Sequence, residues 1–451
     1  MSKRLRTLIA PAYLLACLLI GGSIQGVGFV LALQFTGIAL LAWALLDRSP
    51  WRWRPQARAL PWMSGALLIL CLLQLMPLPP GLWSSLPGRA GIADGYRLLG
   101  QPLPWRPISL SADSGIGVLL TFIPPAALVV LIVKARASTP LGLAIAVALA
   151  TLVSIGLGFA QVASGGRFYL YPWVVQHTPA GLFANPNHAA ALLLAAIPFV
   201  AAYAAARWSA AKKSSDRAAP LAIAGLFAAL LALAIATNGS LAIVLLGLPV
   251  AVASAFLFLP AGRVRLARIA ALIALLLAIG AGAMAIGAGY GLGDSGRVSL
   301  NSRQDMWQGT AQAIADHWLT GSGLGTFADV YPLREDPAKV TRAYVNHAHN
   351  DYLELALELG IAGIALILLF LAWWTRLALA IWRSPGTEAF ARAATIASAA
   401  LLLHSLVDFP LRTAALAALF GAALGLMAAA EKEVRSRDGR KARHVRIEEL
   451  A

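Results

Sequence analysis

Two closely spaced histidines occur where a polar stretch of the chain gives way to a helix-like one. His347 and His349 flank one alanine, and Asn350 and Asp351 follow them as residues that can cap a helix. Histidine is the side chain best suited to exchange a proton near neutral pH. The pair therefore indicates either acid–base catalysis or two surface histidines. A metal site is disfavoured, because no further His or Cys follows at ligand spacing.

Arg303 and Trp307 form a second candidate for chemistry. They stand four residues apart, so on a helix they share one face. An arginine fork pairs with two phosphate oxygens, and the exposed N–H groups of a helix start add to such an anion site. A surface ion pair with Asp294 or Asp305, which would stabilise the fold little, explains Arg303 equally well.

A third group of polar side chains lies near the middle of the chain. Asn185, Asn187 and His188 precede an apolar run, and Arg167 lies upstream with two tyrosines. At a membrane surface these side chains can hydrogen-bond a polar headgroup or a sugar. The alternative is helix capping by Asn187 within an interfacial aromatic belt.

Two smaller features complete the candidates. The glycine-rich stretch at 321–325 lacks the lysine of a nucleotide P-loop, and we interpret it as a tight turn that could approach a substrate. His404, Asp408 and Arg412 form a polar cluster at one end of an apolar run. Ionisable groups near a membrane are often functional, but mutual structural pairing is the favoured interpretation here, ahead of a proton relay.

The elements that must position these residues are membrane helices. The chain is 59% hydrophobic and 12% charged, against roughly 25% charged in a soluble domain, and its mean hydropathy is +0.74. Its apolar runs approach the ~20 residues that a spanning helix requires. We expect an all-α polytopic membrane protein with about twelve spans, at about 8–25, 27–46, 60–78, 114–133, 140–160, 188–206, 220–237, 240–260, 268–288, 360–382, 393–409 and 412–430.

The basic residues predict the orientation of these spans. Most of the 36 Lys and Arg residues fall in alternate loops, which places both termini in the cytoplasm. The net charge of +16 is therefore a topology signal and does not indicate binding of nucleic acid. We expect spans one to nine in 1–288, a large, partly helical periplasmic loop in 289–359, spans ten to twelve in 360–430 and a basic cytoplasmic tail in 431–451. A long polar loop in a tight bundle is usually functional.

In this order, the motifs resemble the O-antigen ligase family, a superfamily of polysaccharide ligases and polymerases. The specific part is a His-Asn pair followed after nine residues by Gly-x-x-Gly, here His349-Asn350 and then Gly360-Ile361-Ala362-Gly363. The resemblance covers most of the chain and implies a GT-C-like membrane fold. Further similar elements are Ser302-Arg303 with Trp307, the Gly323-Leu324-Gly325 turn, and Gly181, Phe183, Asn185 and Asn187.

The chain departs from the family pattern at one position. Family members often carry Ser-Arg-Gly at the start of a span after the middle of the chain, and that arginine is associated with the lipid diphosphate. Here Ser240 is followed by Leu241. Arg167, Arg334 and Arg342 are all candidates to replace the missing arginine.

The resemblance implies a metal-independent, inverting glycosyltransferase of the bacterial inner membrane that acts in lipopolysaccharide biosynthesis of the cell envelope. It needs no cofactor. The donor is a glycan on undecaprenyl diphosphate, and the acceptor is a hydroxyl of lipid A-core or of another lipid-linked glycan. His349 is the expected general base, oriented by Asn350 or Asp351, and Arg303 the expected diphosphate ligand. The expected substrate-binding residues are Arg167, Asn185, Asn187, His188, Trp307, His347 and Asn350.

Other functions remain open at this point. An O-antigen or exopolysaccharide polymerase would use the same chemistry with a lipid-linked glycan as acceptor, and transfer to protein hydroxyls or an inactive scaffold would fit as well. A polysaccharide or lipid transporter is the alternative from another class. A transporter would place charged or helix-breaking residues near the centre of several spans, whereas these spans are mostly Ala and Leu and polarity gathers in one loop.

Overall fold

The computed structural model describes residues 2–23, 28–172, 174, 178–211, 215–238, 240–258, 294–340, 345–384 and 388–429. Within these residues the chain is mostly helical, with very little strand. The two strands β1 (Pro77–Leu78) and β2 (Arg106–Pro107) pair antiparallel at the base of one loop. The predicted span at 268–288, the tail at 431–451 and Arg342 lie outside the described residues.

Within the described residues, seven segments are long and apolar enough to cross a membrane. This confirms the expected kind of protein, while the count of twelve spans stays a prediction. The seven are α3 (Gly28–Leu46), Pro55–Leu75 with η1 (Pro55–Ala57) and α4 (Leu60–Leu75), Ala112–Val133 with α7 (Ala112–Thr121) and α8 (Ile123–Val133), α9 (Pro140–Ala163), α10 (Pro186–Ala210), Arg217–Ile235 within α11 (Ser215–Asn238), and α16 (Asp351–Arg383). Shorter apolar helices are α2 (Ile9–Ile20), α12 (Leu241–Ala255) with η2 (Phe256–Phe258), α17 (Ala389–His404) and α18 (Ala414–Ala428).

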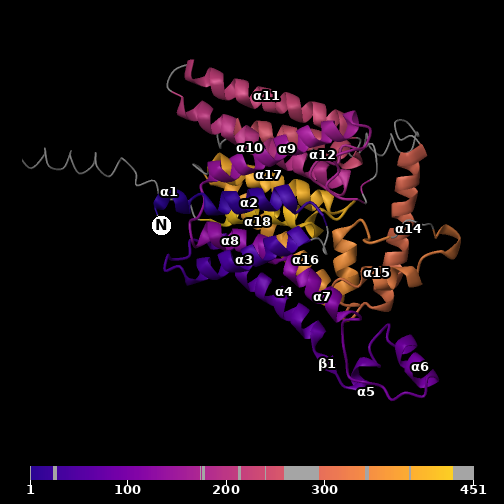
Figure 1. The fold of residues 1–451 in the computed structure, drawn as a ribbon. Coiled ribbons are helices and arrows are strands. Elements are labelled where there is room, and N and C mark those ends of the chain that lie inside the picture. The colour runs from indigo at the N-terminus through magenta and orange to yellow at the C-terminus, as the bar shows by residue number, and fades with distance from the viewer. Residues whose placement is uncertain are drawn as a thin grey trace, which may run out of the picture.

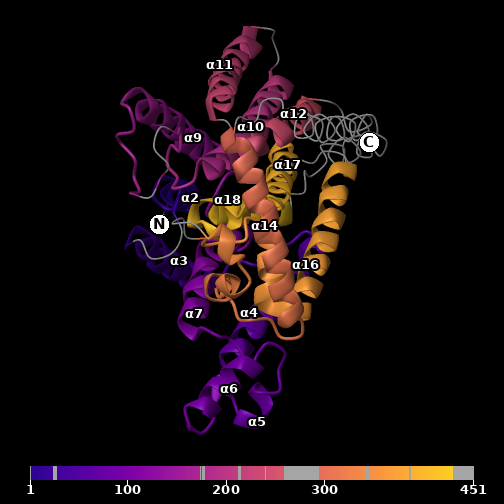
Figure 2. The same cartoon turned by 90° about the vertical axis from the view of Figure 1, so that its right-hand side faces the viewer.

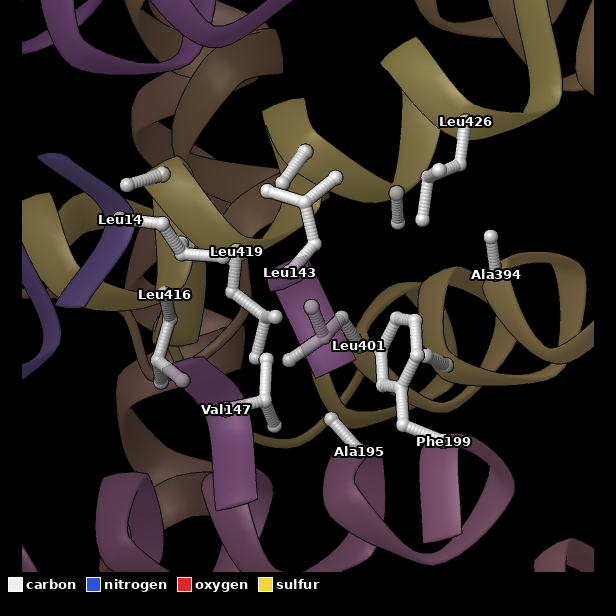
Figure 3. Packing of buried hydrophobic residues seen from close by; sticks show 14 of the residues in the cluster. Leu14, Leu143, Val147, Ala195, Phe199, Ala394, Leu401, Leu416, Leu419 and Leu426 are labelled. Atoms are coloured by element: carbon white, nitrogen blue, oxygen red, sulfur yellow. The ribbon is translucent and has the colours of Figure 1, made fainter. Parts of the chain in front are cut away.

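The centre of the bundle is packed from leucine and alanine. Figure 3 shows residues of α2, α9, α10, α17 and α18 meeting there, with Leu14, Val147, Phe199, Leu401 and Leu419 among them. Many alanines line these helices, and small side chains let spanning helices approach closely. By contrast, α4 and α11 leave most of their apolar side chains exposed, as helices facing lipid do.

The polar elements gather at the end of the bundle away from the N-terminus (Figure 1). Here α14 (Asp294–Asp316) stands across the ends of the bundle helices, and Figure 2 looks onto this end. The remaining short elements are α1 (Lys3–Arg6) near the N-terminus, and α5 (Pro80–Trp83), α6 (Ala90–Leu98), α15 (Phe327–Val330), η4 (Tyr331–Leu333), η5 (Pro337–Lys339) and η6 (Pro410–Arg412).

Gly360 breaks α16 into two helices. Its φ of 61° and ψ of −151° lie outside the helical region and in a region that is accessible to glycine alone. Residues 351–359 therefore lie beside α14, while residues 361–383 continue as a long apolar helix. The predicted Gly-x-x-Gly motif thus marks a bend between the polar end and the span.

The glycine-rich turn at 321–325 packs into this bend. A Cβ atom on Gly321 would lie 2.2 Å from the carbonyl oxygen of Glu358, and one on Gly323 would lie 2.2 Å from Oγ of Ser109. At the end of α4, Gln74 donates hydrogen bonds to the carbonyls of Thr320 and Glu358. Close backbone packing accounts for these glycines, and approach of the turn to a substrate stays a prediction.

Arg89 fastens the loop between β1 and β2 to the same turn. Its guanidinium donates to the carbonyls of Ile108 and Gly321, and the side chain is almost completely buried. Burial, followed by the nearby charge of Arg106, lowers the pKa of Arg89 to about 10. The loop at 79–113 thereby supports the polar end of the bundle.

Candidate functional site

Asp408 is the centre of the polar end. It lies in the turn between α17 and η6 with 1% of its side chain exposed. Asn187 donates from Nδ2 to Oδ2 of Asp408 at 2.6 Å. Nδ1 of His349 lies 3.3 Å from Oδ1, Nε2 of His188 lies 3.7 Å from Oδ1, and Nη2 of Arg303 lies 3.8 Å from Oδ2. One carboxylate thus gathers four of the residues singled out from the sequence.

Asp408 stays ionised in this setting. The turn places it outside the spanning helices, and the backbone N–H of Phe409 donates to Oδ1 at 2.9 Å. Burial by itself raises the pKa of Asp408, but the imidazoles of His188 and His349 outweigh burial and hold the pKa well below its usual range. The site therefore contains a fixed negative charge to which the imidazoles and the guanidinium of Arg303 orient.

Phe409 packs against three histidines. Its ring centroid lies 4.4 Å from that of His347, 4.8 Å from that of His349 and 4.9 Å from that of His188. The rings of His188 and His349 stand nearly perpendicular to it, at 89° and 75°. Phe409 is almost completely buried, so it acts as a wall that fixes the planes of these rings.

His349 is held in a strained backbone conformation and is the partly exposed histidine beside Asp408. Its φ of 48° is unusual for a residue with a Cβ and costs on the order of 1–3 kcal/mol, a strain often found at functional sites. A quarter of its side chain is exposed. Since Nδ1 faces Asp408, the accessible edge of the ring carries Nε2, which is the atom that can take a proton from a bound hydroxyl.

Asn350 and Asp351, which we expected to orient His349, are engaged elsewhere. Oδ1 of Asn350 accepts from the backbone N–H of Tyr352 and Leu353, and its amide donates to the carbonyl of Leu406. Asp351 accepts from Oγ of Ser405 at 2.7 Å. Asn350 is therefore the N-cap of α16, and Asp408 takes the position beside His349 that was expected of its sequence neighbours.

Arg412 forms the centre of a second network of charged residues, which reaches His347 through Glu354. Its Nη1 lies 3.2 Å from Oε1 of Glu354, and its Nη2 donates to Oε2 of Glu358 at 2.9 Å. Glu354 in turn contacts Nδ1 of His347 at 2.7 Å and accepts from the backbone N–H of Ala348 at 2.9 Å. The charges of this network are buried against one another, so it fixes the segment that carries both histidines.

The cluster predicted at 404–412 therefore divides between the two networks. Asp408 belongs to the site and Arg412 to the network behind it. His404 is buried on α17, and neither ring nitrogen has a hydrogen-bond partner within the described part of the chain. The expected mutual pairing of the three residues is therefore wrong for Arg412, which pairs with Glu354 and Glu358 instead, whereas Asp408 directly faces the candidate catalytic residues.

The three remaining predicted residues, Asn185, Trp307 and Arg167, lie in different places. Asn185 caps α10, accepting from the backbone N–H of Asn187 at 2.9 Å. Trp307 lies one turn after Arg303 on α14, and its indole nitrogen is buried without a hydrogen-bond partner among the described residues. Arg167 is exposed on the loop after α9, and no contact between it and Asp408 occurs within the described ranges.

Neither described candidate for the missing family arginine reaches this centre. Arg334 pairs with Asp316 near the end of α14, with 44% and 35% of the two side chains exposed. Arg303 is the guanidinium that lies beside the carboxylate of Asp408. Among the described residues, no group of three or more His, Cys, Asp or Glu side chains has the arrangement of a metal site, and metal-independent chemistry stays a prediction.

Sequence reasoning overlooked Asp408 as the centre of the site. The available signal was a buried acid at the end of an apolar run, next to His404 and Arg412. Its partner Asn187 is separated from it by 221 positions along the chain. Spacing along one helix therefore could not reveal the contact.

Comparison with known proteins assigns a family to part of the chain. Residues 217–368 match the family model described as O-antigen ligase. The matched range runs from α11 into α16 and contains Arg303, Trp307, His347 and His349, whereas Asp408 lies beyond it. A search of curated proteins finds no match.

Proposed function

Since residues 217–368 match the O-antigen ligase family, we propose that the chain is a glycosyltransferase that passes a glycan from undecaprenyl diphosphate to a hydroxyl of lipid A-core. The family match supports a ligase or polymerase type of function in a membrane. The membrane-spanning helices supply the setting that a lipid-linked donor requires.

One observation supports the mechanism: His349 and Arg303 both lie beside the carboxylate of Asp408. Nε2 of His349 takes the proton of the acceptor hydroxyl while the acceptor oxygen attacks the anomeric carbon. The bond from that carbon to the diphosphate oxygen breaks, and the configuration inverts. Asp408, 3.3 Å from Nδ1 of His349, holds the ring in place and stabilises the imidazolium that forms.

Arg303 stabilises the leaving diphosphate. Its guanidinium lies 3.8 Å from Asp408 and is 15% exposed, so it reaches both the carboxylate and the mouth of the site. A fixed guanidinium aimed at the oxygens where negative charge develops lowers the barrier without reorganisation. His188 and Asn187 complete the wall beside it, and Trp307 on the same helix offers an aromatic face to the glycan.

The site is proposed to face the periplasm. It lies at the end of the bundle away from the N-terminus (Figure 1), and the distribution of basic residues places the N-terminus in the cytoplasm. No nucleotide is required there, because the sugar–diphosphate bond of the donor supplies the driving force. A polar cluster at one end of the bundle, rather than at mid-membrane, favours transfer over transport.

The test is complementation of a strain from which the chromosomal copy is deleted, with wild type, His349→Ala, Arg303→Ala and the control Arg334→Ala. General-base assistance supplies ~10²–10⁴-fold, so His349→Ala should abolish visible product at normal protein level. Arg334→Ala removes a guanidinium from an exposed pair and should complement fully.

Lipopolysaccharide and free exopolysaccharide on gels separate the outcomes. Loss of banded glycan on lipid A-core, with lipid-linked polymer accumulating, identifies a ligase. Single-repeat products or missing exopolysaccharide identify a polymerase that uses a lipid-linked acceptor. Unchanged profiles for His349→Ala would refute the proposed enzyme.

A further inference from the structure

An exposed apolar segment lies in the loop between α4 and α7, at residues 98–105. Its sequence, Leu-Leu-Gly-Gln-Pro-Leu-Pro-Trp, contains no charged residue. Leu98, Leu99 and Trp105 are 88%, 75% and 65% exposed. The segment lies outside the spanning helices, where exposure of so much apolar surface to water is unfavourable. Contiguous exposed apolar groups of this kind mark a contact with a partner or with a membrane.

The apolar surface of this segment continues that of α4, which faces lipid. Near the end of α4 Leu72 is half exposed, and so are Met76 directly after it and Leu82 on α5. The indole of Trp83 on α5 donates from Nε1 to the carbonyl of Pro104 at 2.8 Å, which holds the segment against α5. Exposed apolar side chains therefore follow the chain from the span through α5 to residues 98–105.

The loop lies beside the bundle at its polar end. In Figure 1, α5 and α6 lie beyond the end of α4, to the side of the long bundle helices. Figure 2, which looks onto the polar end, shows the same two helices outside the outline of the bundle. Both ends of the loop join spans, because α4 ends at Leu75 and α7 begins at Ala112. The loop thus overhangs the region that lipid occupies around the bundle.

We propose that residues 98–105 insert into the lipid leaflet on the side of the polar end and anchor the loop there. Tryptophan is favoured at the boundary between lipid and water, and exposed leucines supply the apolar groups that enter the leaflet. The partner is the phospholipid bilayer itself. The inference does not depend on the proposed glycosyl transfer.

The anchor acts on the polar end through hydrogen bonds of the same loop. Arg89, just before α6, donates to the carbonyl of Gly321, and the backbone N–H of Leu110 donates to the carbonyl of Ser322 at 2.8 Å. The turn at 321–325 packs against the bend at Gly360. Insertion of residues 98–105 therefore fixes the distance of this bend from the membrane surface.

The test places an environment-sensitive fluorophore on Leu99→Cys in the full chain, reconstituted in vesicles of phosphatidylethanolamine and phosphatidylglycerol. The native Cys17 and Cys71 are buried, and labelled wild type gives their background. Leu333→Cys is the matched control, because Leu333 is 78% exposed and lies on η4, outside this loop. Trp105→Cys is the second labelling position should Leu99→Cys fail to fold.

We expect nitroxides on the lipid acyl chains to quench the Leu99 label and the bilayer to protect it from aqueous iodide. The label should lie about 5–10 Å below the headgroup boundary. The Leu333 label should stay open to iodide and be little quenched by lipid. Equal iodide quenching of both labels, without lipid quenching, would overturn the anchor. Equal lipid quenching of both labels would show a contact that is not specific to residues 98–105 and would also reject the anchor.

The positioning effect of the anchor has a separate measurement. The double variant Leu98→Glu and Leu99→Glu should remove lipid quenching from a label at Trp105→Cys. Glycan transfer should then fall by roughly tenfold or more, because small displacements of catalytic groups are costly, while Leu333→Glu should keep normal transfer. Normal transfer after loss of the lipid contact would reject the positioning effect. If the parent protein shows no transfer, the proposed function fails, and the fluorescence result still decides the anchor.

Discussion

Nδ1 of His349 lies 3.3 Å from Oδ1 of Asp408, and this contact joins the start of α16 to the turn after α17. The same carboxylate is bonded by Asn187 from the start of α10 and approached by Arg303 from α14. The buried carboxylate of Asp408 thus connects its own turn with α10, α14 and the start of α16. We therefore expect Asp408 to matter for activity as much as the residues that touch substrate.

Replacing Asp408 by Asn keeps the shape of the side chain and removes its charge. We expect glycan transfer to fall by roughly 10²-fold or more, because His349 loses the group that orients it and stabilises its protonated form. Transfer is measured in membranes containing equal amounts of protein. Asp316→Asn, in an exposed pair with Arg334, is the control and should be near wild type. Near-normal transfer by Asp408→Asn would exclude the orienting role.

Replacing Arg412 by Ala should reduce stability rather than act on chemistry directly. It leaves the buried carboxylates of Glu354 and Glu358 without their cation, and breaking a buried pair in this way costs ~3–5 kcal/mol. Thermal unfolding of the detergent-purified protein should show a clearly lower Tm. Arg97→Ala, from a pair with 63% and 60% of its side chains exposed, should leave the Tm unchanged. Similar Tm values for both variants would contradict the structural role of Arg412.

Gly360→Ala tests the bend in α16. The backbone conformation at Gly360 costs a residue with a Cβ on the order of 1–3 kcal/mol, and that Cβ would lie 2.6 Å from the backbone nitrogen of Gly321. We expect a lower Tm and loss of transfer, because the bend places His349 relative to the span. In α6, Gly95→Ala meets no atom within 4 Å and should be neutral or stabilise by ~0.5–1 kcal/mol. If Gly360→Ala kept a normal Tm and normal transfer, the bend at Gly360 would not be needed to place residues 351–359.

His317 should make stability depend on pH. Burial, the largest influence, lowers its pKa in the folded protein below the usual value. The unfolded state therefore binds the proton more readily, so the unfolding free energy is fully present above the ordinary pKa of about 6.5 and is lost as pH falls toward the folded-state value. The Tm of wild type should drop more than that of His317→Gln between about pH 7.5 and about pH 5.5. Equal drops would mean that His317 does not contribute.

Some parts of this protein follow from the sequence alone. Composition and hydropathy identify a helical membrane protein, because the preference of each run for lipid depends on its own residues. The spacing from His349-Asn350 to Gly360 and Gly363 predicts a resemblance to the O-antigen ligase family, and the family model matches residues 217–368. Arg303 and His349 were also proposed from local pattern, since the chemical capacity of a side chain is visible in its type.

Only the tertiary structure decided which side chains act together. Local spacing suggested Asn350 or Asp351 as the partner of His349, but Asn350 caps its own helix and Asp351 bonds Ser405. Asp408 comes instead from a distant turn, and the glycines at 321–325 prove to be packing positions. Side chains pair when they are close in space, and which helix ends come close depends on how the whole bundle packs. The hydropathy of each run predicts a helix but does not predict its neighbours.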